Sequence, residues 1–363
     1  MSYHIGILVE RLNGGGAERA AGIISQLLSD LGHKVFLVVL FDDVAYSYEG
    51  KLINLGTFKA GSRSAFSKLG RYKKLQKVLK EENPNLILDF RMKDFPLREK
   101  LLNRFVFNYA MINMVRSYRL DWYFPQPKKI SQKLYADYTG IITVAEEIKK
   151  KVQKEYGFNH VNAIPNAIDL KNIQLKAKVE IHHSKEYVIA VGRFASVKQL
   201  DQLIDAYKSS QLLEKNIQLV LLGDGPEKEN LSQQIKHLGL EEWVRLIPFH
   251  ENPFAWMANA KLLVLSSENE GFPNVLVEAL ACETPVVSFN CSSGPSEIIQ
   301  HEKNGLLVEN QNFKALTEAM NRMIDNQDLY ERCKVFARPS VDCFSMENVK
   351  ELWKQYLFKL NRE

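Results

Sequence analysis

Short apolar runs alternate with longer amphipathic segments along most of this chain. In the first half, four apolar runs predict buried strands, and two amphipathic segments predict helices. The predicted strands are residues 4–9, 34–40, 86–90 and 140–144, and the predicted helices are 17–31 and 146–156. The aromatic and basic stretch 105–133 has no clear assignment, apart from a strand-like run at 109–115.

A second round of the same alternation follows a break near Pro165, after which a polar segment extends to about Lys185. Its predicted strands are 187–191, 217–222, 244–248, 261–265 and 285–289, and its predicted helices are 199–209, 227–238, 253–259, 274–281, 313–325 and 346–360. This alternation is typical of parallel α/β sheets. We therefore predict two Rossmann-like domains, residues 1–168 and 169–345, and a C-terminal helix at 346–360.

Composition agrees with a two-domain globular protein. The chain has 363 residues, 45% of them hydrophobic and 25% charged, and a chain of this length usually forms two cores. The four cysteines have no metal-type spacing, which favours a reducing cytosol without disulfides. The N-terminus lacks signal-peptide features, and we expect no membrane-spanning segment because no uncharged stretch is long enough.

Charge is distributed unevenly between the two halves. Residues 1–168 have a net charge of +10, residues 169–363 have −5, and the stretch 51–80 holds nine Lys and Arg and no acid. The segment 63–80 predicts a helix with an apolar stripe formed by Phe66, Leu69, Tyr72, Leu75 and Leu79. The helix can be an ordinary surface helix, or its basic face can meet anionic lipid headgroups. We expect the N-terminal half to face something anionic.

Candidate chemistry is concentrated between two carboxylates, Glu270 and Glu278. Glu270 follows an apolar strand-like run, and Pro273 opens the helix that follows. The first turn of that helix offers free N–H groups, those of Asn274 and Val275 among them, to an anion. Two Glu eight positions apart are also common on solvated helices. Amides for an anion and carboxylates for hydroxyls together suit a nucleotide sugar.

The sequence around these carboxylates resembles glycosyltransferase family 4, the retaining enzymes of the GT-B fold. The resemblance includes Glu270-Gly271-Phe272-Pro273-Asn274 and continues through residues 279–288, 293–297 and 304–308. Within the family, this run is most similar to bacterial enzymes that build polysaccharide or lipid-linked oligosaccharide. The resemblance implies that the last helix returns to the first domain, that the second domain binds the nucleotide sugar, and that the first binds the acceptor.

The resemblance also implies roles for individual residues. Glu278 would bind ribose hydroxyls, Glu270 would contact the donor sugar near the reacting centre, and Arg193 and Lys198 would neutralise the diphosphate. The other implied donor-binding residues are Gly14, Gly15, Gly16, Phe249, Gly271, Phe272, Asn274 and Val275. Taken alone, the glycine run can be a plain tight turn, and the Arg–Lys pair can be solvated. Gly223-Asp224-Gly225-Pro226 resembles a family turn with a structural role.

One position departs from the family pattern. Many members have a histidine at the end of a first-domain strand, close to the transferred sugar, where Arg116 follows the strand-like run here. A guanidinium can stabilise departing negative charge but cannot act as a base. An ordinary surface arginine is the alternative.

The predicted reaction uses no cofactor and no metal, because the chain has neither HExxH nor an Asp-x-Asp pair at a strand end. The predicted partners are a nucleoside-diphosphate sugar, which the family resemblance implies is UDP-linked, and a glycan or lipid-linked acceptor, with an anionic membrane surface and no nucleic acid. We expect a cytoplasmic protein at the inner face of the membrane. A catalytically silent GT-B subunit and a Rossmann oxidoreductase are alternatives, but the first turn lacks GxGxxG.

Overall fold

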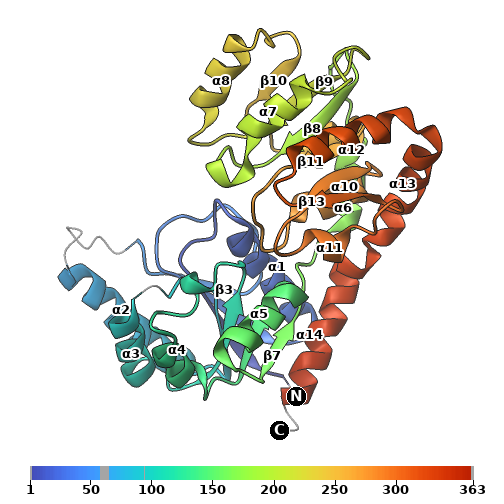
Figure 1. Cartoon of the computed structure of the whole chain (residues 1–363). Coiled ribbons are helices and arrows are strands. Elements are labelled where there is room, and N and C mark those ends of the chain that lie inside the picture. The colour runs from blue at the N-terminus through green and yellow to red at the C-terminus, as the bar shows by residue number, and fades with distance from the viewer. Residues whose placement is uncertain (1, 58–64, 94, 361–363) are drawn as a thin grey trace. The chain divides into compact units, whose positions relative to one another are not determined.

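The computed structural model describes residues 2–57, 65–93 and 95–360, without the side chains of 65–69, and it consists of two α/β units (Figure 1). Unit 1 comprises Met1–Ala167 and Met346–Glu363, and unit 2 comprises Ile168–Ser345. Each unit has one sheet of parallel strands with helices between them. The predicted fold class, two Rossmann-like α/β domains, is confirmed.

Unit 1 contains a seven-stranded sheet in the order β3-β2-β1-β4-β5-β6-β7. Its strands are β1 (His4–Val9), β2 (Lys34–Val39), β3 (Lys51–Asn54), β4 (Leu86–Asp89), β5 (Ala110–Val115), β6 (Gly140–Thr143) and β7 (Val161–Ala163). Its helices are α1 (Gly16–Asp30), α2 (Ala65–Glu82), α3 (Pro96–Phe105), η1 (Leu120–Trp122), α4 (Lys128–Tyr135), α5 (Glu146–Tyr156) and α14 (Met346–Leu360). The strands are apolar because helices cover both faces of a doubly wound sheet.

The C-terminal helix α14 completes the core of unit 1. Its Val349, Trp353 and Leu357 are buried with residues of β1, β2, β4 and α1 in one hydrophobic cluster. Residues 346–360 therefore fold with the first part of the chain, although they are separated from it in sequence by the whole of unit 2.

Unit 2 contains a six-stranded sheet in the order β10-β9-β8-β11-β12-β13. Its strands are β8 (Tyr187–Val191), β9 (Gln218–Leu222), β10 (Val244–Ile247), β11 (Leu263–Leu265), β12 (Val286–Asn290) and β13 (Gly305–Glu309). Its helices are α6 (Leu170–Ala177), η2 (Ser196–Lys198), α7 (Leu200–Lys208), α8 (Lys228–His237), α9 (Pro253–Ala258), α10 (Asn274–Ala281), α11 (Pro295–Ile298), α12 (Phe313–Asp325), α13 (Gln327–Ser340) and η3 (Asp342–Phe344).

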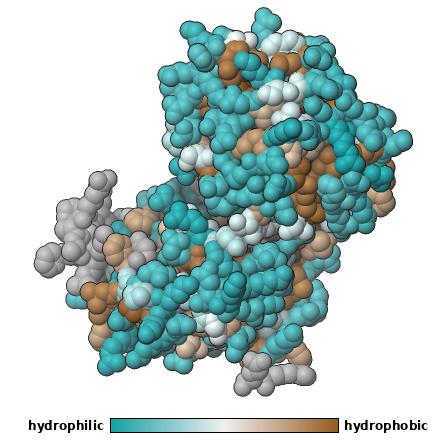
Figure 2. Space-filling view, viewed as in Figure 1, coloured by the Kyte–Doolittle hydropathy of each residue, from teal (hydrophilic) through white to brown (hydrophobic). Residues whose placement is uncertain are grey.

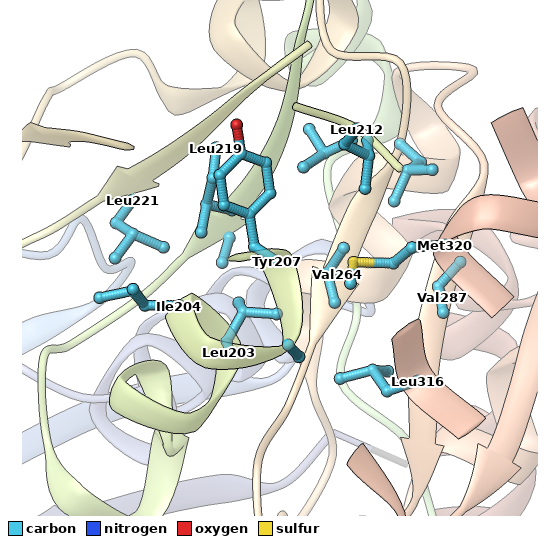
Figure 3. Close-up of a cluster of buried hydrophobic side chains, with 14 of the residues drawn as sticks. Leu203, Ile204, Tyr207, Leu212, Leu219, Leu221, Val264, Val287, Leu316 and Met320 are labelled. Atoms are coloured by element: carbon cyan, nitrogen blue, oxygen red, sulfur yellow. The ribbon is translucent and has the colours of Figure 1, made fainter. Parts of the chain in front are cut away.

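The main core of unit 2 lies between its sheet and the helices α7 and α12. Figure 3 shows Leu203 and Tyr207 of α7, Val264 of β11 and Met320 of α12 converging there, and all four are fully buried. Burial of this kind stabilises a fold by roughly 1.5–3 kcal/mol per large apolar side chain. The core holds the sheet rigid, so the loops at the ends of its strands have a fixed base.

Several elements differ from the sequence predictions. The unassigned stretch 105–133 holds β5, η1 and part of α4. The segment expected to be polar linker contains α6, whose first turn is capped by the Asp169 carboxylate accepting from the Asn172 N–H at 3.0 Å. In the predicted helix 63–80, residues 63 and 64 lie outside the described residues, and so do the side chains of Phe66 and Leu69. The rest of its stripe faces inward, with Leu75 and Leu79 buried.

Candidate active site

Three loops meet at one edge of the unit 2 sheet. They follow β8, β11 and β12, which are neighbours in the sheet and run in parallel. The carboxyl ends of parallel strands are where doubly wound sheets bind ligands. The β8 loop carries Arg193 and Lys198, and the β11 loop carries Glu270.

Lys198 and Glu270 form an ion pair, although 72 residues separate them in sequence. The Lys198 Nζ lies 2.5 Å from the Glu270 Oε1, and both side chains are half-buried. Two further hydrogen bonds fasten the loops together: the Ser266 hydroxyl donates to the Lys198 carbonyl at 2.8 Å, and the Glu268 N–H donates to the Val197 carbonyl at 2.9 Å. The structure thus brings two of the predicted catalytic residues into direct contact.

The loop that carries Arg193 packs on the turn at residues 223–226. The Phe194 N–H donates to the Asp224 carbonyl at 2.8 Å, and the Phe194 side chain is buried. Gly223 has φ +153°, and a Cβ there would lie 1.9 Å from the Gly192 carbonyl oxygen. Only glycine fits so close an approach. The turn supports the loop, and Arg193 itself is exposed at the edge.

The Gly271–Pro273 turn is braced by the loop after β12. The Ser293 hydroxyl donates to the Gly271 carbonyl at 2.8 Å, and Gly294, with φ +95°, packs against Pro273 so closely that a Cβ would lie 2.4 Å from its Cδ. The Phe272 ring is buried against Phe344, with ring centroids 5.2 Å apart. Phe272 therefore offers a ligand its backbone, since its ring is used in packing.

Helix α10 begins beside this turn. The helix begins at Asn274, as predicted, and Pro273 is its N-cap residue and not its first helical residue. The Leu276 N–H bonds the Pro273 carbonyl at 3.0 Å. The N–H groups of Asn274 and Val275 precede it in the first turn of the helix. This turn therefore presents amides and the positive end of the helix dipole.

Glu278 lies one turn further along α10 and is buried. Burial, Glu278 and Glu283 together raise the pKa of the Cys282 thiol to about 12. Burial and Glu270 likewise raise the pKa of Cys291 to about 12. Both cysteines are thiols at neutral pH, so neither is an activated nucleophile.

Sequence reasoning missed two serines at the end of β11. Ser266 and Ser267 line a narrow pocket together with Gly192, Arg193 and Lys198. Ser267 is buried, and its hydroxyl has no hydrogen-bond partner among the described residues. A buried hydroxyl without a partner is unfavourable unless a ligand or water completes it. The only signal in the sequence was that two hydroxyl residues directly follow an apolar run.

Phe249 lies on the loop after β10, and 75% of it is exposed. An aromatic ring this exposed is unusual, and it is free to stack on a planar group. The neighbouring His250 imidazole accepts from the Asn252 N–H at 3.0 Å and is used in shaping the loop.

In unit 1, the glycine loop leads directly into α1. Gly15 is the N-cap of the helix, and Gly14 has φ +83° with open space around it. The Glu18 carboxylate folds back towards Gly15, where a Cβ would lie 2.3 Å from the Glu18 Oε2. Burial raises the pKa of Glu18, although the hydrogen bond from its own N–H lowers it. An anion arriving at this loop would meet that carboxylate as well as the glycines.

Arg116 lies at the end of β5 and is 8% exposed, so it is no surface arginine. Its Nη2 donates to the Asn166 Oδ1, its Nη1 has no hydrogen-bond partner, and no carboxylate pairs with it in the described part of the chain. Burial lowers its pKa to about 10, while Tyr123 raises it. A buried guanidinium that is still charged at neutral pH and unpaired is expected to meet an anion.

The structure therefore gathers Arg193, Lys198, Glu270 and the first turn of α10 at one edge of unit 2, with Glu278 behind them. Gly14, Gly15, Gly16 and Arg116 belong to unit 1. Within residues 2–57, 65–93 and 95–360, no group of three or more His, Cys, Asp or Glu could hold a metal ion. The absence of a metal requirement stays a prediction.

Comparison with known proteins identifies this architecture. The family described as "Glycosyltransferase Family 4" matches residues 14–172, and "Glycosyl transferases group 1" matches residues 171–339. A relative from Campylobacter jejuni, N-acetylgalactosamine-N,N'-diacetylbacillosaminyl-diphospho-undecaprenol 4-alpha-N-acetylgalactosaminyltransferase, is 28% identical over 97% of this chain and 99% of its own. The amylovoran biosynthesis glycosyltransferase AmsD of Erwinia amylovora is 22% identical over 98% and 99%.

A solved structure of HepE from Anabaena in complex with UDP has a TM-score of 0.78, with 19% identity over 99% of this chain and 100% of that one. The two α/β units and the site at the edge of the second sheet define a glycosyltransferase of the GT-B fold. The two family matches together span residues 14–339, and the chain belongs to glycosyltransferase family 4. A Rossmann oxidoreductase, the alternative that the sequence left open, is thereby excluded.

Proposed function

We propose that this enzyme transfers a hexose or N-acetylhexosamine from a UDP-linked donor to a glycan or lipid-linked acceptor, with retention of configuration. The reaction would serve the assembly of bacterial cell-surface polysaccharide or oligosaccharide. The observation that carries the proposal is the Lys198–Glu270 pair beside the first turn of α10. HepE, solved with UDP and with UDP-glucose, and the Campylobacter relative, named for a diphospho-undecaprenol substrate, support the choice of donor and acceptor class.

Each group at the unit 2 edge suits one part of a nucleotide sugar. Arg193, Lys198 and the first-turn amides of α10 would bind the diphosphate, and the unsatisfied hydroxyl of Ser267 would complete a phosphate contact. Glu278 would accept hydrogen bonds from the ribose hydroxyls. The exposed Phe249 and its loop would contact the base, as in the family pattern. These roles need no large rearrangement, because the loops are already fastened to each other.

The ion pair explains why a carboxylate can lie beside a diphosphate. The Lys198 ammonium has three N–H donors, so it can hold Glu270 and a phosphate oxygen together. Glu270 fixes the direction of the ammonium before the substrate arrives, which lowers the reorganisation needed during reaction. The second Glu270 oxygen would then accept a hydroxyl of the donor sugar. In this way the carboxylate would hold the donor sugar so that its bond to the diphosphate is correctly oriented for the reaction.

The chemical step would be a front-face displacement. The bond between the anomeric carbon and the diphosphate oxygen breaks, and both electrons leave with the diphosphate. The acceptor hydroxyl oxygen bonds the anomeric carbon from the same side, and its proton passes to the departing phosphate oxygen. The protein contributes cations and amides that stabilise the charge on UDP. We expect no metal requirement, since these groups supply the positive charge.

Unit 1 would bind the acceptor and contribute Arg116 and the Gly14–Gly16 loop. Arg116 is a buried cation without a carboxylate, so its anion would come from a substrate: the departing diphosphate or a phosphate of the acceptor. We also propose a cytoplasmic enzyme that binds the inner face of the membrane electrostatically. The exposed Lys73, Lys74 and Lys77 of α2 support this, because their face is directed away from the buried Leu75 and Leu79.

A thermal-shift panel of UDP-, GDP- and ADP-sugars tests the donor. A ligand at ~100 times its dissociation constant adds about 2.7 kcal/mol to the free energy of unfolding, so the UDP-sugars should raise the Tm. No response to any nucleotide sugar would contradict the proposal. A silent GT-B subunit would bind the donor without consuming it, so slow UDP-sugar hydrolysis without acceptor separates the two functions.

A further inference from the structure

Helix α3 of unit 1 buries Leu102 and a carboxylate, and it exposes its other large apolar side chains. Its Glu99 is 0% exposed, whereas Leu97, Leu101 and Phe105 are 71%, 48% and 55% exposed. These three residues are spaced by four, so they form one stripe on the outer side of the helix. Phe95, directly before the helix, is 61% exposed. A surface helix normally turns such residues inward and its carboxylates outward.

A buried ionic cluster fixes α3 in this orientation. Glu99 accepts hydrogen bonds from the Arg91 Nη2 at 3.2 Å and from the Arg98 Nε at 2.9 Å. Arg91 also holds Asp89 through two hydrogen bonds of 2.9 and 2.8 Å, and Lys93 lies 3.4 Å from the same carboxylate. Rotating α3 to bury Leu97 and Leu101 would expose Glu99 and leave Arg91 partly unpaired in the interior, which is costly. The outward stripe is therefore a fixed feature of the fold.

Basic side chains border the stripe. Lys100 and Arg104 are exposed on the outer side of α3, one position before Leu101 and Phe105. Helix α2 lies alongside, because the Gln76 Nε2 donates to the Phe105 carbonyl at 2.6 Å, and it adds the exposed Lys73. Figure 2 shows hydrophobic surface in the region of α2 and α3, bordered by hydrophilic residues.

We propose that the outer face of α3 inserts its apolar stripe into the surface of an anionic lipid bilayer. The stripe would enter the boundary between headgroups and acyl chains, while Lys100, Arg104 and Lys73 bind headgroup phosphates. None of the helices in the described part of the chain is long and apolar enough to cross a bilayer, so the contact is at the surface. The inference deepens the proposed function, since it brings the enzyme to a lipid-linked acceptor.

The positive charge around the stripe favours an anionic bilayer over a second copy of the chain as the partner of this face. In a symmetric dimer through this face, the lysines and arginines of both copies would meet like charges. An anionic bilayer instead neutralises every one of them. The surrounding sequence strengthens this preference, because residues 51–80 hold nine Lys and Arg and no acid. Insertion of the apolar stripe also contributes to the free energy of binding, and salt does not screen this contribution.

The test is co-sedimentation of the full chain with vesicles of phosphatidylglycerol and phosphatidylethanolamine, at low and high salt. The triple variant Leu97→Gln/Leu101→Gln/Phe105→Gln should bind at least about tenfold more weakly. The matched control is Leu175→Gln, an equally exposed leucine (68%) on unit 2, which should bind like the native chain. Part of the native binding should survive high salt, and the triple variant should lose that part. Native-like binding by the triple variant would overturn the proposal.

Insertion can be measured directly with an environment-sensitive dye. The one exposed cysteine among those described, Cys343, is replaced by Ser, and the dye is placed at Leu101→Cys or Leu175→Cys. Vesicles should shift the emission to the blue at position 101 and leave it unchanged at 175. No shift at position 101 would overturn insertion, and so would a vesicle-free dimer that the triple variant abolishes. UDP-sugar binding by the triple variant separates these results from a failure of the donor site.

Discussion

Arg116 gives the sharpest prediction, because stability and activity should change in opposite directions. It is almost fully buried, has an Nη1 without a hydrogen-bond partner, and meets no carboxylate in the described residues. Such a residue destabilises the free protein and is retained for a ligand. We predict that Arg116→Met makes the free enzyme slightly more stable and much less active. Met is chosen because it is unbranched and adapts to the space left by the aliphatic stem.

The magnitude follows from the environment of the guanidinium. Burial lowers the pKa of Arg116 from 12.5 to about 10, which corresponds to about 3 kcal/mol of destabilisation of the charged form at ~1.4 kcal/mol per unit. Removing Arg116 also removes its hydrogen bond to Asn166, a loss of about 1–2 kcal/mol. The free energy of unfolding should therefore rise by about 1 kcal/mol. For a unit of this size that is a Tm increase of roughly 2–4 °C.

The pH dependence follows from the same pKa. Because the folded pKa is below the unfolded one, the destabilisation is fully present below about pH 10 and is relieved only as pH rises above it. The Tm difference between variant and native chain should thus be constant from pH 6 to pH 9. The turnover number should fall by about a hundredfold or more at every pH in this range, the usual effect of losing one charge-stabilising donor.

Differential scanning calorimetry and a UDP-release assay measure the two effects. The control is Arg119→Met, which removes an exposed arginine paired with Asp121 at 3.2 Å and should change neither quantity. A Tm several degrees lower in Arg116→Met would show that Arg116 stabilises the fold. Unchanged turnover would show that it binds no reacting anion. Either result would refute the role given to this residue.

The unit 2 site makes further predictions. Glu270→Gln should lose most turnover while nucleotide binding survives, and Glu278→Gln should weaken nucleotide binding by roughly 1–3 kcal/mol in calorimetry; full activity in Glu270→Gln would be inconsistent with its role. Arg193→Ala and Lys198→Ala should each weaken UDP binding more than UMP binding, and equal losses would place them away from the second phosphate. Gly223→Ala should lower the free energy of unfolding, measured in urea, by about 1–3 kcal/mol. An unchanged midpoint of the urea transition would mean that the loop accommodates the added methyl group. Activity should survive a chelator, and a strict metal requirement would contradict the proposed stabilisation of UDP.

Sequence alone predicted the sheets well, because both are parallel and covered on both faces. Apolar runs such as 187–191 are then visible without knowledge of their neighbours. The predicted helix after Glu270 begins at Asn274, as in the structure. The family resemblance assigned Lys198 and Glu270 to one donor site, but their direct contact was not predicted.

Other features depend on tertiary contacts that no local pattern reveals. Helix α3 was not predicted, because Leu102 is its one buried leucine, its other apolar residues face outward, and its Glu99 faces a buried arginine. The burial of Arg116, the unpaired hydroxyl of Ser267 and the folding of Glu18 onto Gly15 each depend on neighbours distant in sequence or on loop geometry. Periodicity indicates which side of a helix is apolar, and it does not indicate what that side meets.

The most direct test of the central claim is sugar transfer itself. The enzyme is incubated with a UDP-hexose or UDP-N-acetylhexosamine and a polyprenyl-diphosphate-linked saccharide, and the product is followed by NMR spectroscopy. The account predicts that the acceptor gains one sugar, that an equal amount of UDP appears, and that the new linkage has the anomeric configuration of the donor. An inverted linkage, or a UDP-sugar that is bound and never consumed with any glycan or lipid-linked acceptor, would contradict it.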